Sequence, residues 1–282
     1  MYDDFINACI TEYVADAENE EEKQTLYRKA RSEFKEFLDY SIGFLTRGCF
    51  RKCDFCVNRN YDRVFAHSPL SEFYDPTRKK ICLLDDNFFG YPKWKEAMED
   101  LQATKKPFKF KQGLDERLMT AQKCEFLCNS KYDGYITFAF DNVNDYPIVE
   151  KKLKLLREYS EHQFNFYVLV AFESQDEKDI ENAFVRIELL MKYGCTPYIM
   201  RFEKYKESEY RGIYITLARW CNQQSFLKKK SFREFVAIAG GAAERYLAEF
   251  EQKHPEIASK YFDMKWSDFN DPKRSIRRTE SG

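Results

Sequence analysis

Short apolar runs alternate with longer helical patterns from residue 40 onward. The runs are rich in Phe, Tyr, Ile and Val, as β-strands are, and they span residues 40–45, 81–84, 108–111, 135–140, 164–171 and 196–200. Between them, apolar residues recur at the helical period over residues 92–103, 121–129, 147–159 and 178–193. Strands that alternate with helices predict a parallel sheet covered by helices. We expect an α/β fold in which six strands curl into a partial, TIM-like (β/α)6 barrel.

Helical patterns without strands flank this alternating region. Residues 1–39 are acidic and place Leu26, Ala30 and Phe34 at helical spacing. Residues 207–270 read as helices whose core anchors are Trp220, Phe226, Phe232 and Phe235. We therefore predict a helical N-terminal extension (1–39), the barrel (40–206), a helical C-terminal extension (207–270) and a mobile basic tail (271–282).

The totals narrow the class of protein. The chain has 282 residues, a formal net charge of -1 and a mean hydropathy of -0.67, and 44% of its residues are hydrophobic. The near-zero charge provides no global attraction for nucleic acid or an acidic membrane. The first residues do not resemble a signal peptide, and no apolar run is long enough to cross a membrane. We expect a cytoplasmic protein, in which nine cysteines indicate a metal site or buried thiols rather than disulfides.

Chemically capable side chains come directly after the predicted strands. In a barrel of parallel strands, the loops at this end carry function. Polar residues of this kind follow every apolar run. The arrangement therefore predicts that thiols, carboxylates and arginines gather on one face of the barrel. The successors are Thr46–Cys49, Asp85–Asn87, Gln112–Arg117, Asp141 with Asn142, Glu173, and Arg201, which is expected one residue beyond the last strand.

Three of the cysteines form a compact pattern. Cys49, Cys53 and Cys56 have the spacing C-x3-C-x2-C. Three thiolates around a 4Fe–4S cluster would leave one iron open. A zinc site usually needs four ligands in two close pairs, and His67, His162 and His254 are isolated in the sequence. Inert loop thiols are the remaining alternative. The spacing favours an iron–sulfur cluster.

The segment Arg47–Cys56 resembles the signature of the radical S-adenosylmethionine (SAM) superfamily, and the resemblance extends over most of residues 40–202. It implies that SAM binds the open iron and is cleaved to a 5′-deoxyadenosyl radical, with Phe55 near the adenine. Residues 85–88 resemble the segment that binds the SAM amino group in relatives with a cobalamin domain. Residues 112–117 and 138–142 resemble segments of uncharacterised bacterial and phage members.

The chain also departs from known branches of that superfamily. The residues before the first predicted strand are too few for a cobalamin domain, which argues against a cobalamin-dependent methylase acting with this chain alone. We also find no second cysteine cluster and no additional RNA-binding module, which argues against a tRNA methylthiotransferase. Cys124 and Cys128 share a helix face, but two thiols are too few for an auxiliary cluster.

Each candidate ligand of SAM also has a structural interpretation. Asp85, Asp86 and Asn87 are expected to accept hydrogen bonds from the SAM ammonium, and otherwise to cap the next helix. Gln112, Asp115 and Arg117 suit the ribose and the methionine carboxylate, or Asp115 and Arg117 form a surface ion pair.

Later candidates have similar alternatives. Asp141 and Asn142 suit ribose or substrate, or shape a turn. Glu173 and Arg201 are candidates for the substrate, although Arg201 can instead pair with an acid such as Glu203. Val170, Ala171 and Phe172 suit an apolar floor for adenine and equally suit the core. Four further cysteines are expected to be core thiols: Cys9, Cys82, Cys195 and Cys221.

These patterns predict a radical SAM enzyme with an unidentified substrate. A small electron donor of the flavodoxin or ferredoxin type is the implied partner, and no membrane partner is expected. Two alternatives remain open: a non-catalytic zinc-binding or regulatory module that contacts nucleic acid through the basic tail, and a radical SAM enzyme that modifies RNA or a peptide. Short lysine runs such as 228–230 are usually solvated faces and do not by themselves indicate nucleic-acid binding.

Overall fold

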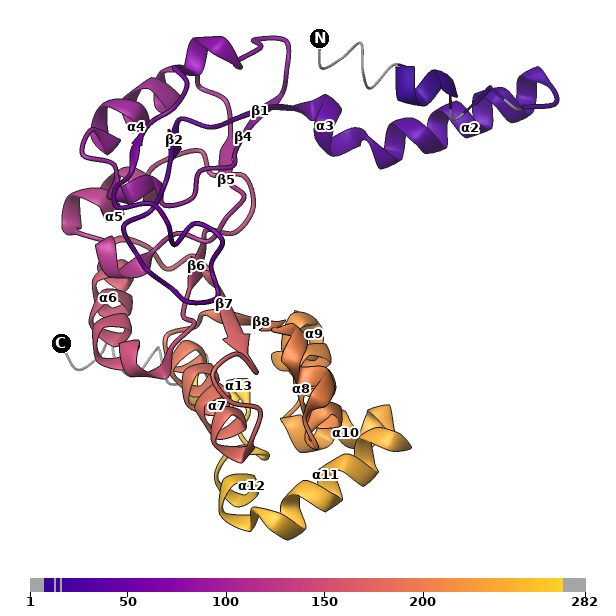
Figure 1. Ribbon diagram of the computed structural model, residues 1–282, viewed down its shortest axis with the longest axis vertical. Helices are drawn as coiled ribbons and strands as arrows, with labels where there is room; N and C mark the ends of the chain where they lie inside the picture. The colour runs from indigo at the N-terminus through magenta and orange to yellow at the C-terminus, as the bar shows by residue number, and fades with distance from the viewer. Residues whose placement is uncertain (1–7, 13, 16, 271–282) are drawn as a thin grey trace, which may run out of the picture. The chain divides into compact units, whose positions relative to one another are not determined.

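The computed structural model describes residues 8–12, 14–15 and 17–270 (Figure 1). These residues form two compact units. Unit 1 contains the described residues up to Phe50, together with Tyr61–Lys111 and Ser130–Asp133. Unit 2 contains Arg51–Asn60, Gln112–Asn129 and the described residues from Gly134 onward. The predicted mobile tail, residues 271–282, lies outside the described residues.

Unit 1 is built around a parallel sheet of three strands. The strands are β1 (Tyr40–Gly43), β4 (Lys80–Leu83) and β5 (Phe108–Phe110), in the order β1-β4-β5. Helix α4 (Trp94–Ala103) connects β4 to β5 and buries Met98. The β–α–β crossover is the connection that parallel strands require.

Two short strands precede the second parallel strand. β2 (Thr46–Arg47) pairs antiparallel with β3 (Phe65–Ala66). Neither was expected, because a two-residue strand is too short to show a period of two. The remaining elements of unit 1 are α2 (Glu20–Glu33), α3 (Lys35–Asp39), η1 (Leu70–Glu72) and η2 (Phe88–Gly90). The two helices confirm the helical prediction over those residues of 1–39.

Unit 2 contains a second parallel sheet. β6 (Thr137–Ala139), β7 (Asn165–Val170) and β8 (Thr196–Arg201) lie in sequential order. Phe166, Val168 and Val170 of β7 are buried and alternate with half-buried residues, as in a sheet with one covered face. The connecting helices are α6 (Tyr146–Tyr159) and α7 (Glu177–Lys192), of which α7 packs on β7 and β8 (Figure 1). Further short elements are α5 (Ala121–Cys128), η3 (Glu116–Leu118), η4 (Val143–Asp145) and η5 (Glu203–Glu207).

Helices complete unit 2 after the last strand. They are α8 (Arg211–Asn222), α9 (Gln224–Leu227), α10 (Phe232–Ala239), α11 (Ala242–Lys253), α12 (Pro255–Tyr261) and α13 (Trp266–Phe269). Trp220, Phe232 and Phe235 are buried as predicted, whereas Phe226 is half-buried and packs edge-on against Phe235. Phe184 of α7 contacts Trp220 and Phe232, and so these helices share a core with the sheet layer.

The six predicted strands are confirmed, each within a few residues of its expected bounds, and the fold is α/β. In the described residues the strands pair as two sheets of three and form no closed sheet. Arg201 is the last residue of β8, not the residue after it as predicted, because the hydrogen-bonded ladder continues through the Val170–Arg201 pair. Among the described helices, none has the length and apolar character needed to cross a membrane.

Candidate functional site

Cys49 follows β2 in unit 1, on a loop held by the carboxylate of Asp86. The Gly48 amide donates to Asp86 Oδ2 over 2.8 Å, and Arg47 Nε lies 3.5 Å from the same oxygen. Gly48 has a φ of +87°, and a Cβ there would lie 2.5 Å from the Arg63 carbonyl oxygen. A side chain at this position would be strained and would clash, so glycine is required for the turn into Cys49.

Asp85 is a buried anchor for the same loop. Its side chain is 3% exposed, and Oδ1 accepts hydrogen bonds of 2.6 Å from both the amide and the hydroxyl of Thr46. The Leu45 amide donates to Oδ2. Burial raises the pKa of Asp85 to about 6, although the hydrogen bonds from Thr46 oppose that shift. Both oxygens are used within unit 1, which indicates a positioning role.

Asn87 links the end of β4 to a cysteine. It is 5% exposed, and its Nδ2 donates to Cys49 Sγ over 3.2 Å. It occupies the N-cap position of η2 but makes no capping bond with its side chain. Its buried Oδ1 has no hydrogen-bond partner among the described residues. One acceptor next to Cys49 therefore remains available for a donor from a ligand.

Cys53 and Cys56 lie in unit 2 and form a tight turn. The Cys56 amide donates to the Cys53 carbonyl over 3.0 Å, and the Asn58 amide lies 3.4 Å from Cys56 Sγ. Cys49, Cys53 and Cys56 are all partly exposed, and none is in a disulfide. In the described part of the chain, no three His, Cys, Asp or Glu side chains are grouped closely enough to hold a metal ion.

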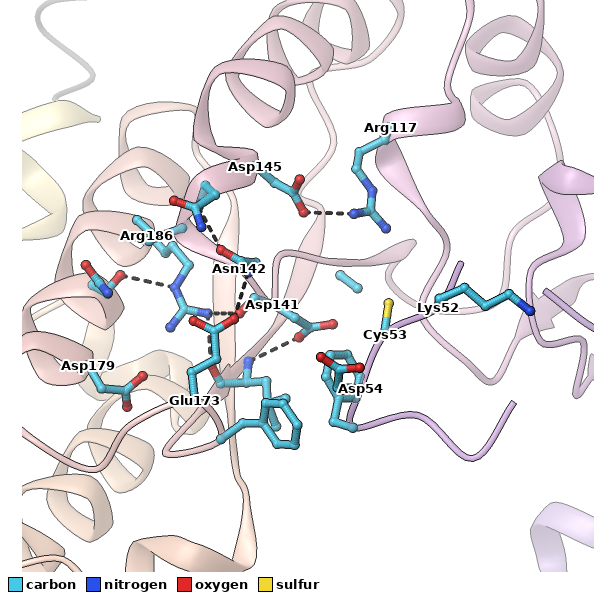
Figure 2. Close-up of a pocket in the computed structure, with 17 residues that line it drawn as sticks. Lys52, Cys53, Asp54, Arg117, Asp141, Asn142, Asp145, Glu173, Asp179 and Arg186 are labelled. Atoms are coloured by element: carbon cyan, nitrogen blue, oxygen red, sulfur yellow. Dashed lines mark hydrogen bonds and ion pairs between the residues drawn. The ribbon is translucent and has the colours of Figure 1, made fainter. Parts of the chain in front are cut away.

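A cavity of about 300 Å³ lies within unit 2. Its lining comes from residues 52–55, from η4, and from residues after β6 and β7 (Figure 2). Six of the predicted site residues line it together: Cys53, Phe55, Arg117, Asp141, Asn142 and Glu173. The rings of Phe55 and Phe172 meet edge-on, with their centroids 5.5 Å apart. The cavity thus combines an aromatic wall with several charged groups.

Asp115 and Arg117 are joined by ion pairs. Asp115 accepts from Arg51 Nε at 2.8 Å and from Arg117 Nε at 2.7 Å, while Arg117 Nη1 lies 2.8 Å from Asp145. Burial would raise the pKa of Asp115, but the two arginines overcome it and hold the pKa below its usual range. Arg117 and Asp145 face one another in Figure 2.

Asp141 and Asn142 follow β6 and line the cavity. Asp141 Oδ1 accepts from the Leu169 amide at 3.1 Å, and burial raises its pKa to about 6, with Arg186 opposing the shift. Asn142 accepts from the Asn144 amide, so it does shape a turn, as the structural alternative supposed. Its Nδ2 also donates to Glu173 Oε1 over 2.9 Å. The ends of β6 and β7 are thereby connected.

Arg186 of α7 was missed by sequence reasoning. It is 2% exposed, lines the cavity and donates through Nη1 to the carbonyls of Phe140, Asp141 and Leu169. The sequence contained a signal, since an arginine occupies the apolar stripe of the predicted helix 178–193. Asp179 on the same helix was also missed; it accepts from the amide of Ala171, a non-glycine residue with a φ of +61°.

Glu116 belongs to the polar segment expected after the third strand, but nothing in the sequence assigns it a role. It is 1% exposed, and its Oε2 has no partner among the described residues. Burial, together with the nearby charge of Asp115, raises the pKa of Glu116 well above its usual range. Burial inside unit 2 therefore favours the protonated, uncharged form of this acid.

Other predicted residues are not gathered at the cavity. Gln112 is exposed, and the exposed Arg201 stacks over the Tyr205 ring at 4.6 Å, which is not the acidic partner suggested from the sequence. Cys124 is buried, and burial raises its thiol pKa to about 12. The expected core thiols Cys82, Cys195 and Cys221 are buried, whereas Cys9 is only half-buried.

Comparisons with known proteins leave the function to be argued from the residues themselves. No protein-family model matches the chain, and no curated protein matches it significantly.

Proposed function

We propose that this protein is a radical SAM enzyme whose Cys49, Cys53 and Cys56 bind a 4Fe–4S cluster. The observation that carries the proposal is hydrogen bonding to sulfur. Asn87 Nδ2 donates to Cys49 Sγ, and the Asn58 amide approaches Cys56 Sγ. N–H donors stabilise thiolate ligands and tune the potential of iron–sulfur clusters.

The donor set also fits the cluster chemically. The three thiols fall within eight residues of sequence and are in no disulfide. Partly exposed thiols are available for ligation, unlike the buried Cys124 and Cys221. Ligand sets commonly become ordered only when metal binds.

A cluster bound by three thiolates supplies the electron that cleaves SAM to a 5′-deoxyadenosyl radical. The residues of unit 1 would orient SAM. Asn87 Oδ1, buried and without a partner, is the best acceptor for its ammonium group. Asp86 can assist, while Asp85 holds the loop through Thr46.

The remaining contacts are assigned to unit 2. Phe55 would cover the adenine, and Asp141 and Asn142 would accept from ribose hydroxyls. Arg117 already forms ion pairs with Asp115 and Asp145. It would therefore bind the SAM carboxylate while it also takes part in these ion pairs. Gln112 is exposed and available to a ligand. Glu173 and Arg201 remain proposed substrate contacts.

We further propose that the alternating strands act as a partial (β/α)6 barrel. In such a barrel, the ends of β1, β4, β5, β6, β7 and β8 would carry the chemistry. The electron would come from a flavodoxin- or ferredoxin-type protein, and the proposed setting is the cytoplasm.

Metal analysis and SAM cleavage test this function. Anaerobically reconstituted protein should contain about four irons per chain, absorb broadly in the blue and release 5′-deoxyadenosine when reduced. Replacing Cys49, Cys53 and Cys56 with alanine should abolish all three signals. Cys128→Ala, which removes a thiol elsewhere, should retain them. Stoichiometric zinc without iron, or full SAM cleavage by the triple variant, would overturn the proposal.

A further inference from the structure

The cavity of unit 2 has an excess of acid. Five carboxylates and three cationic side chains line it, so the formal charge of the lining is 3 − 5 = −2 with every group ionised. Arg117 is already paired with Asp145 at 2.8 Å. Neither Asp141 nor Glu173 forms an ion pair with a described residue, since their contacts are the Leu169 amide and the Asn142 side chain. These two acids can receive a cation.

Arg186 provides a second, independent indication of a ligand. Its side chain is buried, and it uses Nη1 and Nε on main-chain carbonyls. Its Nη2 has no hydrogen-bond partner among the described residues, and no carboxylate lies within ion-pair distance. Figure 2 shows the guanidinium beside Asp141, Asn142 and Glu173. Nη2 is not a fully buried atom, and Arg186 lines the cavity, so this N–H group remains accessible to a ligand that carries an acceptor.

The rest of the lining sets the size and polarity of the ligand. Phe55 and Phe172 meet at an interplanar angle of 78°, and Leu169 adds an apolar surface. A volume of about 300 Å³ is at the small end of ligand sites. Aromatic faces favour a neighbouring cation as well as apolar groups. A small molecule with one charged end and one apolar end matches these features.

We propose that the cavity binds a protonated organic amine that also carries a hydrogen-bond acceptor and a small apolar group. Asp141 and Glu173 receive the ammonium, and Arg186 Nη2 donates to the acceptor. Phe172 and Leu169 contact the apolar group. None of these assigned contacts is a proposed cluster ligand, so amine binding can be measured separately from SAM cleavage.

Three related probes test the ligand class by calorimetry on the full chain at pH 7.5. Phenylalaninol has an ammonium, a hydroxyl and a phenyl group; 3-phenylpropan-1-ol lacks the ammonium, and phenethylamine lacks the hydroxyl. We expect loss of the ammonium to weaken binding about 10-fold or more, and loss of the hydroxyl about 3- to 10-fold. Equal affinity for phenylalaninol and 3-phenylpropan-1-ol would overturn the proposal.

Variants test the assignment to this cavity. Asp141→Asn and Glu173→Gln should each weaken phenylalaninol binding about 3- to 10-fold. Glu173 is exposed, so its replacement leaves the core intact. Glu161→Gln, an exposed acid outside the cavity, removes the same charge and should leave the affinity unchanged. An equal loss in all three variants, or none in the first two, would contradict the proposed site.

SAM itself carries an ammonium group, so the source of the amine must be distinguished. Competition between SAM and phenylalaninol would assign the amine site to the cofactor. Simultaneous binding would assign it to a separate amine substrate and would remove Asp141 from the proposed ribose contacts. Both results support an amine site, whereas SAM cleavage reports only on the proposed enzymatic function.

Discussion

Asn87 connects the end of one strand to the cysteine at the end of another. Its amide nitrogen contacts Cys49 Sγ, while its buried oxygen is without a partner among the described residues. A leucine or alanine at this position, in the loop after β4, could not donate to sulfur. The functional importance of this residue therefore lies in one N–H group and one acceptor.

Replacing Asn87 with alanine should weaken iron binding while the protein stays folded. Loss of a hydrogen bond to a metal ligand typically costs about 10- to 100-fold in metal affinity. Iron content after dialysis against a chelator measures the loss. Gln102→Ala, which removes an amide side chain hydrogen-bonded to Ser130 elsewhere in unit 1, is the control and should retain its iron. Equal iron retention by both variants would show that Asn87 does not contribute to iron binding.

Asp85 should make the stability of the protein depend on pH. Burial raises its pKa from the ordinary 3.8 to about 6 in the folded protein. The stabilisation that protonated Asp85 gives to the folded state is therefore fully present below about pH 4 and is lost as the pH rises through about 6. The resulting change in the free energy of unfolding is about 3 kcal/mol at most. Asp85→Asn should remove this dependence, because the amide oxygen can still accept from Thr46.

Chemical unfolding of the wild type and of Asp85→Asn at several pH values tests that sign. The difference in unfolding free energy should shift in favour of the variant between pH 4 and pH 7. A difference independent of pH would show that Asp85 does not titrate in this range.

At the scale of elements, α7 holds two neighbouring strands together at their ends. Arg186 contacts carbonyls at the end of β6 and on β7. Asp179, two turns earlier on the same face of α7, accepts from the Ala171 amide and from the Tyr214 hydroxyl of α8. These polar groups lie on the buried face of a helix that otherwise packs through residues such as Ile180, Phe184 and Ile187.

Arg186→Met should therefore destabilise unit 2 despite the similar length of the side chain. Three buried carbonyls lose a charged donor, and we expect a cost of about 2–4 kcal/mol. Urea unfolding measures this cost. Lys192→Met, on the exposed end of the same helix, should change stability by less than about 0.5 kcal/mol. A similar effect of both replacements would show that the hydrogen bonds of Arg186 contribute little to the stability of unit 2.

At the scale of the molecule, each compact unit contains one three-stranded parallel sheet. Cys49 belongs to unit 1, and Cys53 and Cys56 belong to unit 2. The proposed cluster binds only the folded chain, so its energetic effect should appear in the unfolding of the protein.

Iron loading should raise the thermal midpoint of the wild type. A ligand that binds only the folded state stabilises it by about 2.7 kcal/mol at 100 times its dissociation constant. Anaerobic calorimetry before and after reconstitution measures the shift. Cys49→Ala should show no gain, whereas Cys128→Ala should match the wild type. A gain in Cys49→Ala equal to that of the wild type would exclude Cys49 as a ligand.

The elements could largely be predicted because their signals are local. Runs such as residues 164–171 became β7, and the pattern over 178–193 became α7. The β2–β3 pair could not, since Thr46 and Phe65 are distant in sequence and each strand has two residues. Six predicted site residues line one cavity, whereas Arg201 stacks on Tyr205 and is not part of its lining. The six are Cys53, Phe55, Arg117, Asp141, Asn142 and Glu173.

The sequence alone determined the α/β alternation, the compact cysteine pattern and the polar residues after each strand, because periodicity and spacing are properties of neighbouring residues. Tertiary structure decided which of those residues remain available to a ligand. Asp85 and Asp86 bind the loop before Cys49 through hydrogen bonds. Asp115 forms ion pairs with two arginines. Arg186 and Asn87 gained their importance from partners distant in sequence. Hydrogen bonds and burial depend on these distant partners, which no local pattern encodes.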